Sequence, residues 1–290
     1  MSQTAARRHS LRTPGSSQPG ERLPLSEQVA LITGASMGIG AATARDLARC
    51  GAQVVMVARG ADQLREQVSL INAAGGKAMA MPADISDPRQ VERLIADTQD
   101  AFGKIDVLVN NAGMGWGKLL AHSSPSEIQR IVAVNLTGAM LVTRAALPGM
   151  LSRHRGMIIN VASVSGRVAV EPLYSATKYG LRGFTLSLRR QLADSGVSVC
   201  LVSPGKIRTN QTRDSNEPMD EPEVVAGAIA KLIKEPRREV IVPWKFHAMV
   251  WLEQALPGVA DRAYQWRHRK YSVSPCKCAA CAAGASGDHG

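Results

Sequence analysis

Seven short apolar runs alternate along this chain with longer segments in which apolar residues recur at helical spacing. Runs such as Val-Ala-Leu-Ile at 29–32 show no alternation of polar and apolar residues, which is typical of strands buried on both faces. Strands of that kind occur in parallel sheets, because the connections of a parallel sheet place helices on its faces. We therefore predict an α/β fold with a seven-stranded parallel sheet. Its strands are expected at Val29–Thr33, Gln53–Val57, Lys77–Met81, Val107–Val109, Met157–Val161, Val197–Val202 and Val240–Val242.

The two ends of the chain differ in composition from its centre. Residues 1–25 are rich in Ser, Pro, Gly and Arg, and residues 274–290 are rich in Ala, Gly and Cys. Neither end has enough apolar surface to offset the entropy lost on ordering, so we expect two disordered tails. The α/β domain is expected to occupy residues 26–243, and residues 244–273 are expected to form a helical extension.

The predicted extension begins with an apolar segment, residues 244–256, and continues with a basic and aromatic one, residues 262–271. Thirteen apolar residues fall short of the ~20 that a membrane-spanning helix needs, and we expect no such helix elsewhere in the chain. The segment can pack against protein, cover an apolar substrate, or lie at the surface of a membrane. Burial against protein is the simplest of these, and peripheral membrane contact is the alternative.

The net charge of +11 is spread over both ends and the centre without a basic and aromatic recognition pattern, so we expect no nucleic-acid partner. Such a charge also attracts an anionic cofactor. The five cysteines are an odd number, and the three at 276, 278 and 281 do not have the spacing of a zinc knuckle. We therefore expect neither a disulfide framework nor a metal site. No apolar segment follows the N-terminal arginines, so we expect a cytoplasmic protein, with an organellar presequence as the alternative.

A glycine-rich segment, Thr33–Gly40, directly follows the first predicted strand and precedes a helical segment, Ala41–Cys50. Glycines permit a tight turn, let the backbone approach a pyrophosphate, and allow the helix to pack closely on the sheet. The amino end of that helix offers N–H groups and the positive end of its dipole to phosphates. We therefore predict a dinucleotide site, with a plain turn as the alternative. The expected contacts are Gly34, Ser36, Met37, Gly38, Ile39 and Gly40.

The residue that closes the second predicted strand bears on the choice of nucleotide. An NAD site carries an acid here that binds the ribose 2′-hydroxyl, whereas this chain has Ala58 and Arg59. A guanidinium can bind a 2′-phosphate through forked hydrogen bonds, so NADP(H) is the preferred cofactor and NAD(H) the alternative. After the third strand, Asp84 and the adjacent Ile85 are expected to meet the adenine, although Asp84 also suits a helix cap or a turn.

Tyr174 and Lys178 are four residues apart, which places them on one face of a helix. An ammonium beside a phenol favours the phenolate, so we expect Lys178 to lower the pKa of Tyr174 from ~10 toward neutral pH. A phenol tuned in this way can exchange a proton with a substrate oxygen. Such a pair is common by chance, and its significance depends on the motifs that accompany it.

Several motifs accompany the pair in a fixed order along the chain. They are Thr33–Gly40, Asn110–Gly113 after the fourth strand, Asn135, Ser163 after the fifth strand, and Pro204–Thr209 after the sixth. Together with the Tyr-x-x-x-Lys pair they resemble the short-chain dehydrogenase/reductase family over residues 26 to about 243. The resemblance implies a single Rossmann-like, doubly wound domain that binds NAD(P). It also implies hydride transfer between the nicotinamide and an alcohol or carbonyl, that is, action on CH–OH groups.

The resemblance implies a role for each matched residue. Tyr174 corresponds to the general acid/base, and Lys178 to the residue that lowers its pKa and holds the nicotinamide ribose. Ser163 corresponds to the donor that polarises the substrate oxygen, and Asn135 to the residue that kinks the backbone and holds a water in the proton relay. The remaining cofactor contacts are expected at Asn111, Ala112 and Gly113 on the adenine and ribose side, and at Pro204, Gly205, Ile207 and Thr209 on the nicotinamide side.

Two features depart from the family pattern. Ser163 and Tyr174 are 11 residues apart, an interval shorter than in most members, which alters the loop that bears Glu171. Met37 stands where NADP-preferring relatives often have a basic residue. The expected protein is an NADP-preferring oxidoreductase, a homodimer or homotetramer, that acts on a fairly apolar small-molecule alcohol or carbonyl. An epimerase or dehydratase of the family, and a cofactor-binding sensor or scaffold without turnover, are the alternatives.

Overall fold

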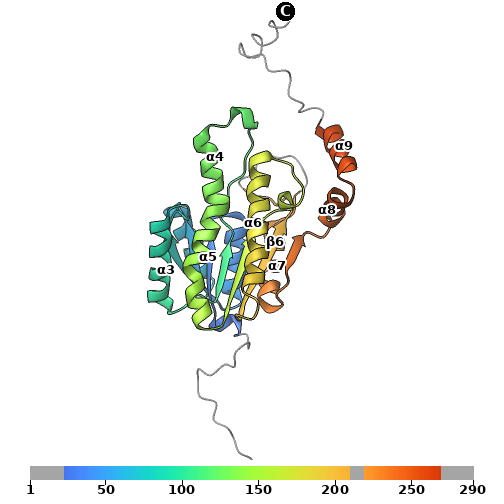
Figure 1. The fold of residues 1–290 in the computed structure, drawn as a ribbon. Coiled ribbons are helices and arrows are strands. Elements are labelled where there is room, and N and C mark those ends of the chain that lie inside the picture. The colour runs from blue at the N-terminus through green and yellow to red at the C-terminus, as the bar shows by residue number, and fades with distance from the viewer. Residues whose placement is uncertain (1–22, 210–218, 269–290) are drawn as a thin grey trace, which may run out of the picture. The chain divides into compact units, whose positions relative to one another are not determined.

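The computed structural model describes residues 23–209 and 219–268 (Figure 1). These residues fall into two compact units, one that ends at Phe246 and one that begins at His247. The predicted tails lie almost entirely outside the described residues, as do the cysteines at 276, 278 and 281. Leu25, the last residue of the first predicted tail, opens a short 3-10 turn, Leu25–Glu27 (η1), and packs against the core.

Seven strands among the described residues form one parallel sheet in the order β3-β2-β1-β4-β5-β6-β7. Every predicted strand is present within two residues at either end, so the predicted α/β fold is confirmed. The central strands β1 and β4 are buried along their whole length, as their continuous apolar runs indicate, whereas β3 at the sheet edge is partly exposed. The strands are β1 Val29–Thr33, β2 Gln53–Ala58, β3 Lys77–Pro82, β4 Val107–Asn110, β5 Gly156–Val161, β6 Val197–Pro204 and β7 Glu239–Val242.

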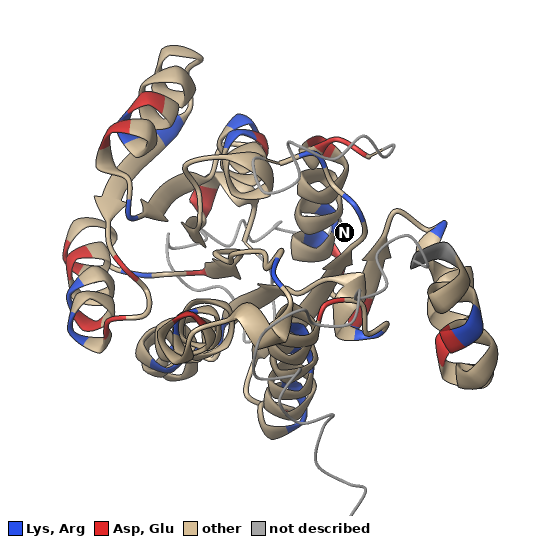
Figure 2. Cartoon of the chain, turned by 90° about the horizontal axis from the view of Figure 1, so that it is seen from above, with Lys and Arg blue, Asp and Glu red and all other residues tan. Residues whose placement is uncertain are grey.

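Helices cover both faces of the sheet. Side chains of α1, α2 and α7 pack on one face, and those of α3, α5 and α6 pack on the other. Within β1, Ile32 belongs to the first layer and its neighbour Leu31 to the second, because successive side chains of a strand point to opposite faces. Figure 2 shows charged residues along the helices and loops, while β1, β2, β4, β5 and β6 carry none. The helices of this unit are α1 Gly38–Arg49, α2 Ala61–Ala73, α3 Pro88–Phe102, α4 Pro125–Val132, α5 Gly138–Ser152, α6 Pro172–Gln191 and α7 Pro222–Lys234.

A single helical run extends from Pro125 to Ser152, because a π-helical turn, Ala133–Thr137 (η3), joins α4 to α5. By length and composition alone this run could cross a membrane. Its apolar side chains, however, include Val142 and Met150, which pack in the core against the sheet. The run is therefore a core helix of the α/β unit.

Asp106 lies at the opposite end of the sheet from the predicted site, immediately before β4. Its side chain is 5% exposed, and its Oδ2 accepts a hydrogen bond from the Val29 backbone N–H (3.0 Å) and pairs with Lys104 Nζ (3.0 Å). It lines a cavity of about 700 Å³, to which Gly156 and Val197 at the amino ends of β5 and β6 also contribute. A buried carboxylate, paired with a partly exposed lysine, thus braces the amino ends of the central strands.

The second unit contains the predicted helical extension. It consists of α8, which begins in the last residue of the first unit (Phe246–Ala255), and α9, Pro257–His268. Val250 is buried, whereas Trp251 and Trp266 are exposed. The exposed tryptophans give these short helices an apolar surface, which a protein, a substrate or a membrane could cover.

Candidate active site

The glycine-rich segment between β1 and α1 is built on backbone packing. Gly34 and Gly38 have positive φ angles of 66° and 55°, which residues with a Cβ rarely adopt. A Cβ on Gly34 would lie 2.7 Å from the Ala112 Cα, and a Cβ on Gly40 would overlap the Gly34 carbonyl oxygen. No side chain caps the amino end of α1, so its first N–H groups face this cradle uncapped. The segment therefore has a shape that fits a pyrophosphate.

The loop after β4 is fastened to the glycine-rich segment by hydrogen bonds. Asn111 Nδ2 donates to the carbonyl oxygens of Thr33 (3.0 Å) and Gly34 (3.2 Å). The Thr33 hydroxyl in turn accepts from the backbone N–H groups of Asn111 and Ala112, both at 3.1 Å. Asn111 and Ala112 thus form one wall of the cradle, where the sequence motif places them.

The residues predicted to meet the adenosine end of the cofactor differ in exposure and in their partners. Arg59 is exposed directly after β2, and Met37 is exposed beside the cradle. Asp84 Oδ1 accepts from Ser86 N (2.9 Å) and Ser86 Oγ (2.6 Å), so its side chain closes a turn. Although burial alone raises the pKa of Asp84, the bonds from Ser86 and the charge of Arg59 bring it below its usual range. The Ile85 side chain is buried and points at Gly138 of α5.

Ser163, Tyr174 and Lys178 come together beyond the carboxyl ends of β5 and β6. Ser163 opens a 3-10 turn, Val164–Gly166 (η4), and its hydroxyl lies 3.5 Å from the Pro204 carbonyl oxygen that ends β6. Tyr174 and Lys178 lie one turn apart near the start of α6, with the lysine Nζ 5.5 Å from the centroid of the phenol ring. Lys178 Nζ also donates to the Val161 carbonyl oxygen (3.1 Å).

Burial controls the ionisation of this pair. It raises the pKa of Tyr174 to about 12, against a lowering effect of the hydrogen bond with Ser163, and the charge of Glu171 raises it further. Burial also lowers the pKa of Lys178 to about 8. In the protein without cofactor the pKa of Tyr174 is thus raised, because desolvation outweighs the effect of Ser163. The expected lowering by Lys178 together with the charge of a bound cofactor stays a prediction.

Asn135 links three parts of the site from within the π turn. Its Oδ1 accepts from the Met114 backbone N–H (2.7 Å), and its Nδ2 donates to the Met114 carbonyl (2.9 Å) and to Thr177 Oγ1 (3.2 Å). A Cβ on Gly113 would lie 3.4 Å from Asn135 Oδ1 and 3.5 Å from Lys178 Nζ. The amide thus holds the loop after β4 against the helix that carries Tyr174 and Lys178.

The segment after β6 extends from Ser163 to the glycine-rich cradle. Gly205 N–H donates to the Val242 carbonyl (2.7 Å), and a Cβ at this position would overlap the Phe246 ring. Ile207 is buried and forms a bridge with Asp220. The Thr209 methyl carbon lies 3.2 Å from where a Cβ on Gly38 would be. The segment therefore reaches from Ser163 to the glycine-rich turn, and its contact with a nicotinamide stays a prediction.

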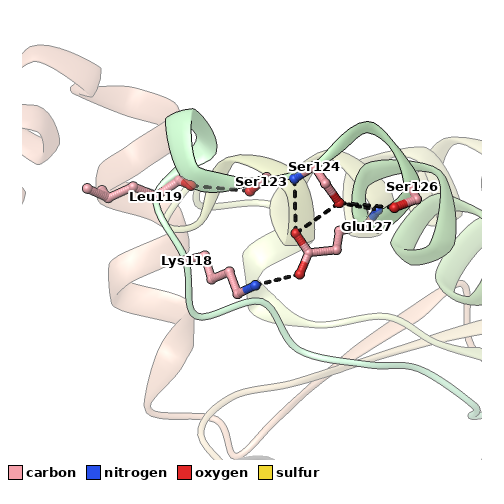
Figure 3. A network of polar contacts seen from close by, with 6 residues as sticks. All are labelled: Lys118, Leu119, Ser123, Ser124, Ser126 and Glu127. Carbon is pink, nitrogen blue, oxygen red and sulfur yellow. Dashed lines mark hydrogen bonds and ion pairs between the residues drawn. The ribbon is translucent and has the colours of Figure 1, made fainter. Parts of the chain in front are cut away.

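A polar network orders the loop that leads from Gly113 into α4 (Figure 3). Ser124 and Glu127 form a capping box, in which Ser124 Oγ accepts from Glu127 N (3.2 Å) and Glu127 Oε2 accepts from Ser124 N (2.9 Å). Lys118 Nζ donates to the other Glu127 oxygen. These bonds lower the pKa of Glu127 to about 2. The box is a sequence-readable start signal for α4.

Two carboxylates around the candidate site were given no role from the sequence. The first is Glu171: burial raises its pKa, and the Trp116 backbone N–H and the charge of Lys206 lower it. Its position three residues before Tyr174 was the sequence feature from which its closeness to the phenol could have been predicted. The second group is the buried carboxylate of Glu239 with its partners, which no local motif announces.

Comparisons with known proteins agree with this geometry. The short chain dehydrogenase family model matches residues 28–220. A ketoacyl reductase, HetN, from Nostoc sp. is 38% identical over 83% of this chain and 90% of its own length. A 3-oxoacyl-(acyl-carrier-protein) reductase from Synechocystis sp. is 40% identical over 77% of this chain and 96% of its own length.

Solved structures lead to the same family. A metagenomic short-chain oxidoreductase in complex with NADP has a TM-score of 0.69 and 38% identity over 76% of this chain and 98% of its own. A short-chain type dehydrogenase/reductase from Mycobacterium marinum has a TM-score of 0.72 and 30% identity over 77% of this chain and 96% of its own. The chain therefore belongs to the short-chain dehydrogenase/reductase family of NAD(P)-binding oxidoreductases.

Proposed function

We propose that this protein reduces the 3-keto group of an acyl thioester, or a comparable apolar ketone, with NADPH. The observation that carries the proposal is the placement of the partly buried phenol of Tyr174 with Ser163 and Lys178 beyond the ends of β5 and β6. The names of its relatives, a ketoacyl reductase and a 3-oxoacyl-(acyl-carrier-protein) reductase, support a 3-oxoacyl substrate. The relatives thus support the substrate class, and the arrangement of Ser163 and Tyr174 supports the carbonyl chemistry.

The bound nicotinamide supplies or accepts the hydride in this chemistry. The residues that would hold the cofactor are the backbone of Thr33–Gly40 at the phosphates, the loop Asn111–Gly113 at the adenosine side, and Pro204–Thr209 at the nicotinamide. Arg59 would bind the 2′-phosphate, and Lys178 the ribose hydroxyls. The uncapped first turn of α1 and the cradle without Cβ atoms support this assignment.

The side chains of this chain would move the proton. Tyr174, with a pKa of about 12, is protonated throughout the neutral range and can donate its hydroxyl proton to a carbonyl oxygen. Ser163 stands beside that hydroxyl and can donate a second hydrogen bond to the same substrate oxygen, which stabilises negative charge developing there. The protonated phenol is the form that carbonyl reduction requires, since it must give a proton to the substrate oxygen.

The preference for NADP(H) rests on Arg59, exposed at the end of β2 with no acid at position 58. A related structure solved with NADP supports it. The water-holding role of Asn135, the homodimeric or homotetrameric assembly, the cytoplasmic location and the peripheral membrane contact stay predictions. Light scattering in solution tests the assembly, and sedimentation with vesicles tests the membrane contact.

Tyr174→Phe tests the proposal, because it removes one hydroxyl and keeps the ring. We expect turnover of a 3-oxoacyl thioester, followed by NADPH absorbance, to fall by about 10²- to 10⁴-fold. NADPH affinity, measured by fluorescence, should change by less than about threefold. Tyr179→Phe on the same helix is the matched control and should keep wild-type turnover. Near-normal turnover in Tyr174→Phe would remove the phenol from the mechanism, and NADPH binding by a wild type that turns over no carbonyl would favour a sensor.

A further inference from the structure

A single buried carboxylate at the start of β7 binds three separate segments of the chain. The Glu239 side chain is 7% exposed and accepts from Arg167 through Nε (2.6 Å) and Nη2. It also accepts from Ser203 Oγ (3.0 Å) and pairs with Arg182 Nε (3.4 Å). Both carboxylate oxygens are thus used, and each partner comes from a different element.

Each of these partners is adjacent to a residue of the candidate site. Arg167 follows the η4 turn that Ser163 opens. Arg182 lies one turn beyond Lys178 on the same face of α6, since the two are four residues apart. Ser203 directly precedes Pro204, whose carbonyl oxygen faces the Ser163 hydroxyl at 3.5 Å. Glu239 therefore connects the serine turn, the tyrosine helix and the end of β6.

The serine turn also touches the tyrosine helix directly. A Cβ on Gly166 would lie 2.7 Å from the Lys178 carbonyl oxygen, so the two backbones are in close contact there. A shift of the turn that carries Arg167 must then move either Ser163 or the backbone at Lys178. The positions of Ser163 and of the backbone at Lys178 therefore depend on each other. Arg167 fixes both, because its side chain is bound by Glu239.

The electrostatics favour a charged carboxylate. Burial raises the pKa of Glu239, but the hydrogen bond and charge of Arg167, the charge of Arg182 and the bond from Ser203 together bring it below its usual range. The Arg167 side chain is itself only 16% exposed. Removing the negative charge would leave a mostly buried guanidinium without its counter-ion. An unpaired buried charge is costly in free energy, so the arginine would then move toward solvent.

We propose that Glu239 is a positioning residue that fixes the relative placement of Ser163, Tyr174 and Lys178 through Arg167, Arg182 and Ser203. The inference rests on the proposed carbonyl reduction. The hydrogen bonds of Glu239 go to the η4 turn, α6 and β6, and not to the glycine-rich segment. Loss of the Glu239 carboxylate should therefore lower kcat and leave nucleotide affinity nearly unchanged.

Glu239→Gln tests the inference, with Asp106→Asn as the matched control. Both variants replace a buried, ion-paired carboxylate by its isosteric amide, but Asp106 lies at the amino ends of the strands, away from the site. We expect both to lower Tm. Only Glu239→Gln should lower kcat, by about 10- to 100-fold, since a small misplacement of reacting groups has that cost. NADPH affinity should stay within about threefold of wild type in both.

Hydrogen exchange gives a readout that does not need turnover. In Glu239→Gln, amide exchange should rise in peptides that cover residues 163–182, whereas in Asp106→Asn it should rise near β4 instead. Arg167→Gln should reproduce the kcat loss. The double variant Arg167→Gln/Glu239→Gln should lose no more activity than the worse single variant, because both changes break one connection.

The outcomes separate the two hypotheses. If the wild type reduces no carbonyl substrate, the proposed function fails, and the exchange pattern still decides whether Glu239 holds these segments. A kcat of Glu239→Gln equal to that of Asp106→Asn would overturn the inference, as would unchanged exchange over 163–182. A loss found entirely in NADPH affinity would contradict it too.

Discussion

The two halves of the candidate site are held in shape by different means. Around β1 and α1 the shape comes from backbone: Gly34 and Gly40 leave no room for a Cβ, and Asn111 hydrogen-bonds to main-chain carbonyls. Around β5, β6 and β7 it comes from buried polar side chains, chiefly Ser163, Lys178 and Glu239.

This difference has a practical meaning for substitutions. Atoms added to the backbone half have nowhere to go, so a single methyl group should damage folding and nucleotide binding together. In the side-chain half, a conservative replacement keeps the volume and changes only a proton or a charge. Substitutions there should separate turnover from folding.

The largest expected effect is that of Gly40→Ala, because the added Cβ would overlap the Gly34 carbonyl oxygen. We expect a loss of about 3 kcal/mol or more in the free energy of unfolding and a fall of at least about 100-fold in NADPH affinity. Gly227→Ala in α7 is the control, since no atom lies within 4 Å of where its Cβ would be, and it should be neutral or stabilising by up to about 1 kcal/mol. Normal NADPH binding by Gly40→Ala would break the contrast between the halves.

Lys178→Met should lower turnover by about 10²-fold or more and still leave a stable protein. Below pH 8 the folded protein buries an ammonium whose pKa has fallen from 10.5 to about 8, at a cost of about 3 kcal/mol. The variant removes that cost but also loses the bond to Val161, so we expect its Tm at pH 7 to equal or exceed that of wild type.

The pH dependence of that comparison has a definite sign. Between pH 8 and 10.5 the unfolded chain keeps the lysine proton that the folded protein has released, so wild-type stability rises with pH relative to the variant. The advantage of Lys178→Met should therefore shrink over this range in thermal unfolding. An advantage that grows with pH would contradict the lowered pKa.

A smaller effect is expected for cofactor choice. It tests whether Arg59, at the edge of the backbone half, selects the 2′-phosphate. Ala58→Asp combined with Arg59→Ile adds a carboxylate that accepts from a ribose 2′-hydroxyl and repels a 2′-phosphate. We expect the ratio of kcat/KM for NADPH over NADH to fall by about 10- to 100-fold, with Arg59→Ile alone giving part of the change. A wild type that already prefers NADH at matched concentrations would show that Arg59 does not select the phosphate.

The smallest expected effect lies outside both halves, in the capping box of α4 (Figure 3). Ser124→Ala removes the acceptor for the Glu127 N–H and should cost about 1 kcal/mol of stability. Turnover and NADPH affinity should stay at wild-type values, because the cap acts only on the start of the helix. A marked loss of kcat would mean that the loop from Gly113 to Ser124 contributes to the site.

The sequence predicted most of what depends on local pattern. Strand positions followed from buried apolar runs, and the places of Ser163, Tyr174 and Lys178 followed from motifs that keep their order. The Glu239 connections were not predictable, because its partners are 72, 57 and 36 residues away in the chain. The direction of the Tyr174 pKa shift was not predictable either, because it depends on how deeply the packed fold buries the phenol.

The π turn at Ala133–Thr137 makes the helical run from Pro125 to Ser152 sensitive to insertions and deletions. A π turn holds one residue more than an α turn, and each residue of an α-helix advances the direction of its side chains by about 100°. Deleting one residue here would restore a regular helix and rotate α4 by about that angle relative to α5. Asn135 would then point away from Met114 and Thr177 even though its identity is unchanged. At this point of the chain, residue count is as much a functional property as residue type.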